Sequence, residues 1–382
     1  MSSGSRLESS SPTHQKLLSN IIHQAYPNRK LISTRKLSVS AGVYLTYETL
    51  LDDGTTIIIH WRDEPPSNLE NEVAWAHHAF GSGVYISKWL AAHSKFPAPR
   101  PLSPPRNPDI FVAEKILGES ISSSYSSLSP SAKANLVRSY ADLSVDLFKL
   151  VVPQYIGTAA PGEPDSVLTV TPHLGSSNRC RAPKVFISLE DYLDHVFTLK
   201  RRASILDTND DDKFRAQAAI SQLISHFKRL SSRLTEPSLR RCVLSQTDLR
   251  ESDVFTDVEG QITGVLSWQL HSIQPAILAV DYPPWLRYDG VNDPRYSPHK
   301  VRLEEPEESA RLRRIYEERV QLLDRDYHMA LTQGAQLRAA VGWVLDTHDD
   351  RGCSRMREWM LSSFGPPVSS PSALDDARCV IA

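Results

Sequence analysis

Two short β-type runs stand in the middle of the chain, between long segments of helical periodicity. Val254–Thr256 and Ile262–Leu266 flank a DVEG turn, and an acidic stretch from Asp248 to Asp253 precedes them. Turn residues between two β-rich runs predict an antiparallel hairpin. An acidic loop followed by a hairpin is the layout of a catalytic loop, yet the second run ends in Ser267 instead of an acid.

The segments before this hairpin combine strand and helix patterns. Apolar spacing predicts a helix over 13–25, and the Asp53-Gly54 turn between alternating runs predicts a β-hairpin. Helices are predicted from about Glu70 and again from about Ile86. Residues 35–118 therefore have the character of a small mixed α+β lobe.

Helical patterns dominate from Ser129 onward. Ser129 and Pro130 begin one predicted helix. Ser188 with the acid three residues later resembles a capping box and begins another. A charged helix is predicted from about residue 307 to 345. The hairpin is thus inserted among helices of a larger lobe, in which we expect Trp268 and Trp285 to pack.

A chain of 382 residues is long for a single core, so two lobes with tails are expected. The predicted parts are a tail and helix at 1–34, a nucleotide-side N-lobe at 35–118, a C-lobe with the catalytic loop and substrate side at 119–345, and a short helix with a disordered tail at 346–382.

The composition narrows the function classes. The net charge of −2 gives no support for a general nucleic-acid surface. No apolar run reaches the length of a membrane span, and the Ser-rich N-terminus lacks the apolar core of a secretory signal. The four cysteines are far apart and show no CxxC spacing, so we expect reduced thiols in a cytoplasmic protein. A mitochondrial transit peptide is the less favoured alternative for the N-terminus.

Phosphoryl transfer needs a loop acid to accept a proton, carboxylates that hold Mg²⁺, and a cation near the phosphates. The stretch QTDLRESDVFTDVEGQITGVLSWQ offers acids with this layout. It resembles the aminoglycoside phosphotransferase and choline-kinase-like family, most of all its fungal branch. YPPWL, NEVAWA and the hinge segment FVAEKILGES carry further parts of the resemblance, which covers roughly residues 35–345.

The resemblance implies an α+β fold of the bilobal protein-kinase type, with a β-rich N-lobe and a helical C-lobe that contains the hairpin. It implies ATP and Mg²⁺ as cofactors, a small-molecule substrate, and no nucleic-acid partner. Asp248 falls on the catalytic base, and Asp253 and Ser267 fall on the metal-binding positions. The positions implied for nucleotide binding are Gly42, His60, Glu72 and the hinge residue Glu114, with Arg62 as a further cation.

Several of these positions depart from the family's pattern. Gln246 stands where the family has His, Asp253 where it has Asn, and Ser267 where it has the acid that grips Mg²⁺. His60 stands in place of a Lys or Arg, and a buried strand histidine is its structural alternative. Gly42 is the one glycine of the loop expected over the nucleotide, so support for a phosphate cradle is small.

The departures predict a pseudokinase-like protein, because loss of the main metal carboxylate removes several kcal/mol and each ~1.4 kcal/mol is tenfold in rate. The alternative is an active phosphotransferase with Asp248 as base, Asp253 as metal ligand, and Arg62 as the cation paired with Glu72. Reuse of the cleft for another reaction is a third alternative without specific support. Whether the chain is an enzyme therefore stays open, and the substrate is not readable.

The last four residues, CVIA, match a prenylation signal. Cys379 is the predicted farnesylation site, and one prenyl chain would give weak, reversible membrane association. Asp375 and Asp376 stand where basic residues usually support such an anchor, so a coincidental tail is the alternative. Prenylation in the cytosol also counts against mitochondrial import.

Overall fold

The computed structural model describes residues 12–40, 44–61, 70–103, 110–162, 167–173, 182, 184–203, 218, 220–228, 232, 234–287, 303–346 and 350–365. The chain forms two compact units. The first comprises Met1–Tyr192, Glu236–Arg287 and Val301–Gly334, and the second comprises Leu193–Thr235, Tyr288–Lys300 and Ala335–Ala382. The boundaries expected from the sequence, near residues 34, 118 and 345, stay a prediction.

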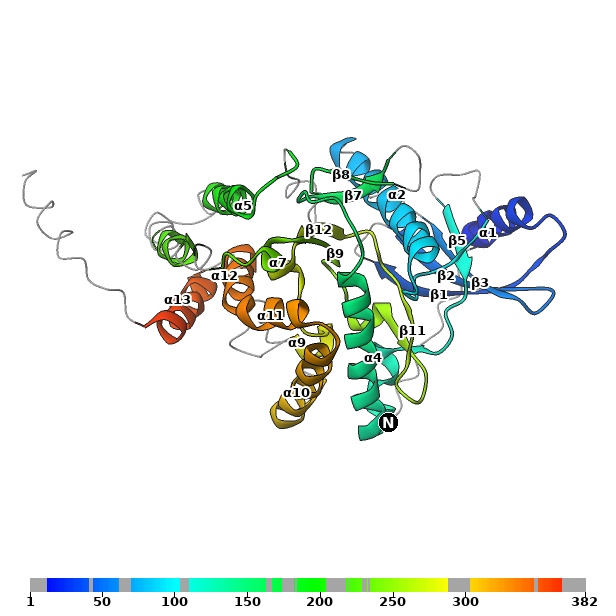
Figure 1. The fold of residues 1–382 in the computed structure, drawn as a ribbon. Helices are drawn as coiled ribbons and strands as arrows, with labels where there is room; N and C mark the ends of the chain where they lie inside the picture. The colour runs from blue at the N-terminus through cyan, green and yellow to red at the C-terminus, as the bar shows by residue number, and fades with distance from the viewer. Residues whose placement is uncertain are drawn as a thin grey trace, which may run out of the picture. The chain divides into compact units, whose positions relative to one another are not determined.

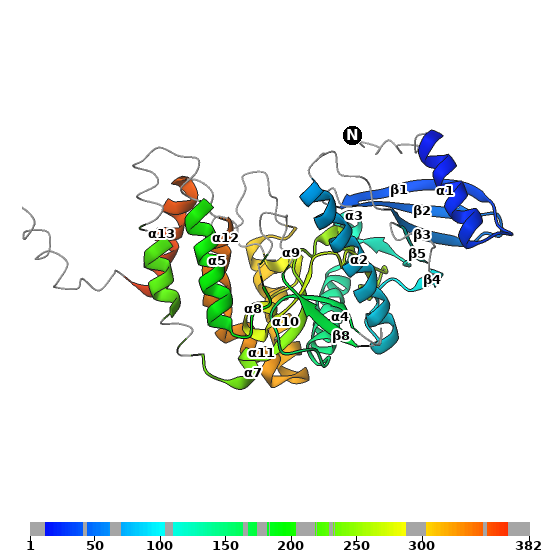
Figure 2. The ribbon, with the colours of Figure 1, turned by 90° about the horizontal axis from the view of Figure 1, so that it is seen from above.

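The first unit contains a five-stranded antiparallel sheet in the order β1-β2-β3-β5-β4 (Figure 2). Its strands are β1 (Leu31–Ser40), β2 (Tyr44–Leu51), β3 (Thr56–Trp61), β4 (Pro101–Ser103) and β5 (Ile110–Glu114). Gly54 turns between β2 and β3 at φ +83°, a conformation that glycine adopts without steric cost. The predicted Asp-Gly hairpin is confirmed.

Two helices pack on opposite faces of this sheet. Helix α1 (Pro12–Ala25) buries its apolar stripe against Ile59 and its neighbours on one face. Helix α2 (Glu70–His93) places Phe80 against Phe111 on the other face. Side chains alternate between the faces of a strand, so each strand contributes to both layers.

The sequence predicted two helices where α2 is one continuous helix, and this prediction was wrong. Gly81 and Gly83 lie in its middle, where glycine weakens a helix by about 1 kcal/mol. Tertiary packing outweighs that loss. A Cβ atom on Gly83 would lie 2.8 Å from the Cα of Gln269, so the glycine permits a close backbone contact.

The larger part of the first unit is built around α4 (Pro130–Phe148), which packs beside α10 (Pro306–Leu323) (Figure 1). Ser129 caps α4 by accepting a hydrogen bond from the backbone N–H of Ala132 at 3.2 Å, as the sequence predicted. The remaining strands are β6 (Glu119–Ser120), β7 (Thr158–Pro161), β8 (Leu168–Thr171), β9 (Cys242–Gln246), β10 (Val254–Thr256), β11 (Ile262–Val265) and β12 (His271–Pro275). The short helices are α3 (Ile121–Ser124), η1 (Tyr125–Ser127), α7 (Pro237–Arg240), η3 (Glu251–Asp253), α8 (Ala276–Ala279) and α9 (Pro284–Arg287).

Strands β10 and β11 form the predicted hairpin, and β6 adds to it in the order β11-β10-β6. Gly118 precedes β6 at φ +86°, and a Cβ atom there would lie 2.3 Å from the carbonyl oxygen of Thr256. Gly260 turns the hairpin at φ +84°, where a Cβ atom would lie 2.0 Å from the carbonyl oxygen of Ala132. The hairpin is therefore fixed against both the hinge segment and α4.

The single helix expected over 307–345 is three helices, so that prediction was wrong. They are α10, α11 (Arg325–Gln333) and α12 (Ala335–Asp346). Asp324 leaves the helical conformation at φ −161°, and its side chain accepts a hydrogen bond from the N–H of Tyr327 at 2.9 Å. This cap begins α11 and ends α10.

The second unit contains most of α5 (Leu189–Ala203) together with α12 and α13 (Asp350–Phe364). Aromatic contacts hold it together, among them Trp343 with Trp359 at 6.2 Å between ring centroids. Ser188 caps α5 by accepting from the N–H of Asp191 at 3.1 Å, as predicted. In the part of the chain that the structure describes, no helix has the length and apolar character needed to cross a membrane.

Candidate functional site

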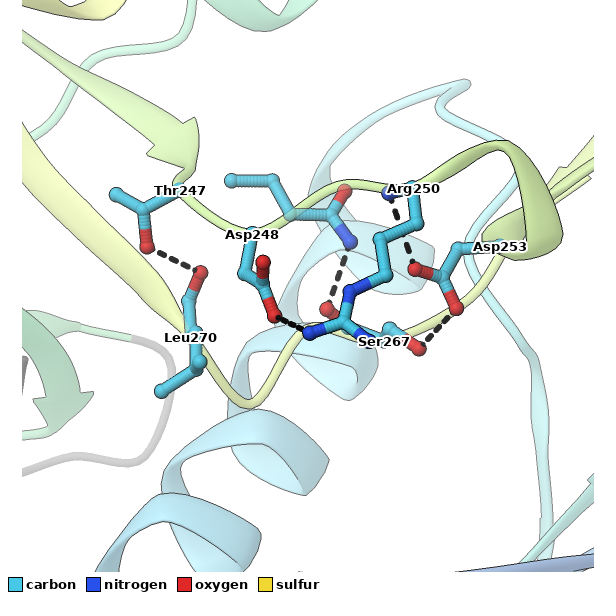
Figure 3. A network of polar contacts seen from close by, with 7 residues as sticks. Thr247, Asp248, Arg250, Asp253, Ser267 and Leu270 are labelled. Atoms are coloured by element: carbon cyan, nitrogen blue, oxygen red, sulfur yellow. Dashed lines mark hydrogen bonds and ion pairs between the residues drawn. The ribbon is translucent and has the colours of Figure 1, made fainter. Parts of the chain in front are cut away.

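The acidic loop, residues Asp248 to Asp253, follows strand β9, whose end is held by pairing and hydrogen bonds. Gln246 ends β9 opposite His271 on β12. Thr247 then bonds the carbonyl oxygen of Leu270 twice, from its backbone N–H at 2.9 Å and from its hydroxyl at 2.8 Å. The loop therefore starts from a point that is anchored to the strand following the hairpin (Figure 3).

Asp248 lies at the solvent-accessible start of the loop. Its Oδ2 accepts a hydrogen bond from the Arg250 guanidinium at 2.7 Å, and the two side chains are 43% and 52% exposed. The hydrogen bond that Arg250 donates to Asp248 raises the pKa of Arg250. Exposed ion pairs contribute about 1 kcal/mol or less, so this pair can open for a substrate at small cost. A carboxylate in this setting can act as a general base.

Asp253 ends the loop and is only 6% exposed. The hydroxyl of Ser267 donates to its Oδ1 at 2.6 Å, and the backbone N–H of Arg250 donates to its Oδ2 at 3.1 Å (Figure 3). Burial raises the pKa of Asp253, although these two hydrogen bonds act in the opposite direction. Both oxygens are thus engaged by groups of the chain itself.

Ser267 adopts a conformation that serine seldom takes. Its φ is +66°, and among the described residues it is the one non-glycine residue with positive φ. Glycine, asparagine and aspartate tolerate this left-handed region better. The side-chain amide of Gln246 helps to hold it, because Nε2 donates to the carbonyl oxygens of Leu266 at 2.6 Å and Ser267 at 2.7 Å.

The turn after Ser267 is fixed from two further directions. Gly83 of α2 approaches the backbone of Gln269 closely. His271 is buried, with Nδ1 2.6 Å from the carbonyl oxygen of Trp268 and Nε2 3.1 Å from that of Ala159. A neutral imidazole can donate to only one of two carbonyl oxygens. Burial nevertheless lowers the pKa of His271, against the effect of those two carbonyl groups.

Sequence reasoning did not identify Arg250 or His271 as part of this site. A signal for Arg250 was present, because a basic residue two positions after a loop acid can fold back on it. His271 gave no signal beyond its place after the hairpin. Trp268 and Trp285 are buried, 1% and 5% exposed, which confirms that they pack in the core.

His60 lies in the interior of β3 and is 4% exposed. Its Nδ1 lies 3.1 Å from the hydroxyl of Thr46, and its ring stacks on Phe111 with 5.7 Å between centroids. Burial lowers the pKa of His60 to about 4, so the ring is neutral at pH 7 and supplies no cation. A nucleotide-binding role for His60 stays a prediction, and the contacts agree with its structural alternative.

The other residues expected at the nucleotide divide into two groups. Glu114 ends β5 with an exposed side chain, and Glu72 lies in α2, with its side chain outside the described part. Gly42 and Arg62 lie outside the described residues, as does the predicted lipidation site Cys379. The roles of all five stay predictions.

The residues at the metal-binding positions offer Mg²⁺ a poor donor set. Among the residues that the structure describes, no group of three or more His, Cys, Asp or Glu side chains is arranged to hold a metal ion. Mg²⁺ favours carboxylate oxygens. Only Asp253 supplies one at the two expected positions, and its Oδ1 already accepts from Ser267. A metal there would compete with that hydroxyl for the oxygen.

Comparisons with known proteins give one close relative and many similar folds. No protein-family model matches the chain. Clavilactone A biosynthesis cluster protein Y from Ampulloclitocybe clavipes is 38% identical over 356 residues, covering 91% of this chain and 87% of that protein.

The solved structures of similar fold include aminoglycoside phosphotransferases. A thermostable mutant of aminoglycoside phosphotransferase APH(4)-Ia in its apo form has 13% identity, covers 91% of this chain and 100% of that one, and gives a TM-score of 0.50. The streptomycin-ATP-APH(2")-IIa ternary complex has 10% identity, covers 92% and 96%, and gives a TM-score of 0.54. The predicted α+β protein-kinase-like fold, with a small antiparallel sheet and a larger helical part, is confirmed.

Proposed function

Because the chain belongs to the family of clavilactone A biosynthesis cluster protein Y and has a phosphotransferase-like fold, we propose that its ATP-dependent phosphoryl transfer to a small molecule is impaired or lost. The observation that carries this proposal is the hydrogen bond from the Ser267 hydroxyl to Asp253 Oδ1 at 2.6 Å. It pairs the groups at the two expected metal-binding positions with each other, so that the Asp253 oxygen accepts a hydrogen bond from the chain itself.

The charge at these positions supports the same conclusion. Ser267 contributes a neutral hydroxyl where the aminoglycoside phosphotransferase and choline-kinase-like pattern has an acid. Burial favours the protonated form of Asp253, as its raised pKa indicates. At the strand position where the resemblance implies a cation, His60 is neutral at pH 7. Ser267 and His60 therefore bring no charge to positions where the resemblance implies one, and charge is what phosphoryl transfer requires.

A second candidate function is an active small-molecule phosphotransferase. Asp248 favours it, because its carboxylate is accessible and is engaged only by an exposed ion pair with Arg250. Asp248 would accept the proton of the acceptor hydroxyl, and Asp253 would have to release Ser267 to hold a metal. ATP, when bound, would supply the phosphoryl group. The solved relative with streptomycin and ATP makes nucleotide use a reasonable starting point for tests.

A thermal-shift titration with ATP, with and without Mg²⁺ or Mn²⁺, separates the two candidates. We expect no metal-dependent stabilisation of the wild-type protein by ATP. We expect Ser267→Asp combined with Asp253→Asn to gain it, since the left-handed backbone at 267 accommodates aspartate. Metal-dependent ATP stabilisation of the wild type, with turnover that Asp248→Asn abolishes, would establish the active enzyme instead.

A role for this chain in small-molecule biosynthesis is supported by the relative alone. The relative's name places that protein in a clavilactone A biosynthesis cluster. We extend to this chain a role in small-molecule biosynthesis, as a protein that binds a substrate or ligand of that kind. Deletion of the gene in its host should change the profile of secondary metabolites. An unchanged profile under conditions where the protein is expressed would refute this role.

Cytoplasmic location and reversible membrane association through a farnesylated Cys379 are further proposals. The membrane association rests on the sequence pattern CVIA, and the cytoplasmic location rests on that pattern together with the spacing of the four cysteines. Intact-mass measurement of the protein from a prenylating host should show the farnesyl increment. A mass that matches the unmodified chain would rule out the lipid anchor in that host.

A further inference from the structure

The first unit contains a partly open cavity of about 180 Å³ that Leu249 of the acidic loop helps to line. Helix α4 forms one side, and β9 forms another. Asp281 and Arg287 lie at the end formed by the segments after α8, and Tyr327 of α11 completes the wall. We call this space the α4–β9 cavity.

The volume of the α4–β9 cavity sets the size of what it can hold. An engineered protein cavity of roughly 150 Å³ binds benzene. A volume of about 180 Å³ therefore accepts a single six-membered ring with a small substituent. A nucleotide or an aminoglycoside is far too large, so this cavity is not the nucleotide or antibiotic site of the related folds.

The chemistry of the walls separates the cavity from a dry packing defect. Leu143, Leu147 and Val243 supply an apolar surface. Tyr140 and Ser144 supply hydroxyl groups, and a hydroxyl can both donate and accept a hydrogen bond. A ligand with an apolar face and one polar edge is complementary to such walls.

The charges of the walls cancel. Among the described residues that line the cavity, Asp281 and Arg287 are the charged ones, and their side chains lie 3.3 Å apart. A compensated ion pair gives no net attraction for an ion, so the walls favour a neutral ligand. The two side chains are 30% and 23% exposed, so water reaches this end of the cavity. That end offers a route of entry.

We propose that the α4–β9 cavity is a binding site for a neutral one-ring molecule that carries a hydroxyl group, the size of phenol. Asp248 and Asp253 do not line the cavity, although Leu249 of the acidic loop does. Gln246 does line it, and the same side chain holds the carbonyl oxygen of Ser267. An occupant therefore contacts the residue that fixes the turn at the end of the hairpin.

Phenol binding to the wild-type protein, followed by NMR, tests the proposal directly. We expect saturable one-to-one binding, with intermolecular NOEs from the ring protons to the methyl groups of Leu143, Val243 and Val280. Absence of saturation, or NOEs confined to other residues, would overturn the proposal. The measurement needs no nucleotide or metal, so its failure is distinct from failure of the proposed function.

Variants of the wall sharpen the test. Ala279→Leu fills the cavity and should weaken phenol binding by at least roughly tenfold, because the added side chain takes the space of the ring. Leu143→Phe fills it from α4 and serves if the first variant does not fold. Ser144→Ala removes the hydroxyl without adding bulk to the wall, so it should weaken phenol binding more than toluene binding. Unchanged phenol binding in a folded filling variant, or equal effects of Ser144→Ala on both probes, would contradict the proposal.

Discussion

Strand β3 and the acidic loop each carry one buried ionisable side chain where a phosphotransferase needs charge. His60 is 4% exposed and Asp253 is 6% exposed. Burial lowers the pKa of the histidine to about 4 and raises the pKa of the aspartate. Both shifts favour the uncharged form, although one group is a base and the other an acid.

The two regions differ in what surrounds the buried group. Asp253 accepts hydrogen bonds from the Ser267 hydroxyl and the Arg250 N–H, which support an ionised carboxylate. His60 lies against the Thr46 hydroxyl and the ring of Phe111, and burial lowers its pKa. The comparison teaches that the loop keeps a polar setting from which metal binding could be regained, whereas the strand position has become part of the core.

The substitution His60→Lys tests whether the strand position tolerates a cation, and it should have the largest effect. We expect the substitution to lower the free energy of unfolding by about 4 kcal/mol at pH 7, because a buried ammonium must lose its proton or disrupt the core. Urea denaturation measures the change, with His60→Gln as the uncharged control. Equal stability of the two variants would show that a cation is tolerated at this strand position.

Acid should destabilise the wild type through the same histidine. The folded-state pKa of about 4 lies below the unfolded value, so the unfolded chain gains a proton first as the pH falls. The loss begins near pH 6.5 and reaches about 3 kcal/mol at pH 4. Urea denaturation across this range should show a smaller loss for His60→Gln. Parallel pH profiles of the two proteins would contradict the buried neutral ring.

The backbone beneath the loop can be tested by Gly260→Ala, with Gly54→Ala as its match. Both glycines have nearly the same φ, +84° and +83°, but only Gly260 has a neighbour, the carbonyl oxygen of Ala132, within contact range. The left-handed conformation costs roughly 1–2 kcal/mol in either variant, and overpacking adds about 1–2 kcal/mol at Gly260. Equal losses of unfolding free energy would mean that the hairpin is not fixed on α4.

The contact between α2 and the Ser267 turn gives a second matched pair. Gly83→Ala should cost about 2 kcal/mol, because its Cβ atom would meet the backbone of Gln269 at 2.8 Å. Gly81→Ala has open space and should stabilise the helix by up to about 1 kcal/mol. Thermal unfolding compares the two. If both substitutions stabilise the protein, the close approach of α2 to the turn is wrong.

The smallest expected effect concerns Asp253. Because its pKa is raised on folding, the folded state holds its proton longer, and stability falls as the pH rises through the window above the unfolded pKa. Asp253→Asn removes this slope. We expect the variant to gain stability relative to wild type between pH 4 and pH 7 in denaturant titrations. A relative loss would show that Ser267 and Arg250 outweigh burial and hold an ionised carboxylate.

Local chemistry made much of the fold predictable. The turn between two β-type runs predicted the hairpin that ends at Ser267, and Ser129 predicted the start of α4, because each depends on neighbouring residues only. The continuity of α2 was not predictable, since Gly83 meets Gln269 from a distant part of the sequence. Asp324 likewise has the composition of a surface acid, and only its bond to the Tyr327 N–H shows the helix break.

The site was predictable in its positions and not in its contacts. Spacing placed Asp248, Asp253 and Ser267 in one stretch, but spacing does not state that the hydroxyl and the carboxylate bond each other. The link from Gln246 to the Ser267 carbonyl depends on a strand pairing across the hairpin. Alternation along a strand places His60 on one of two faces, but the sequence does not show that helices cover both faces of this sheet. The burial of His60 was therefore not predictable.

The absence of a side chain at Gly83 has a mechanical consequence. Where two backbones touch without an intervening side chain, there is no soft layer that could absorb relative displacement. We therefore expect helix α2 and the turn at Gln269 to move together at this contact. A ligand that tilts the helix would carry the Ser267 turn with it, so the two lose an independent degree of freedom.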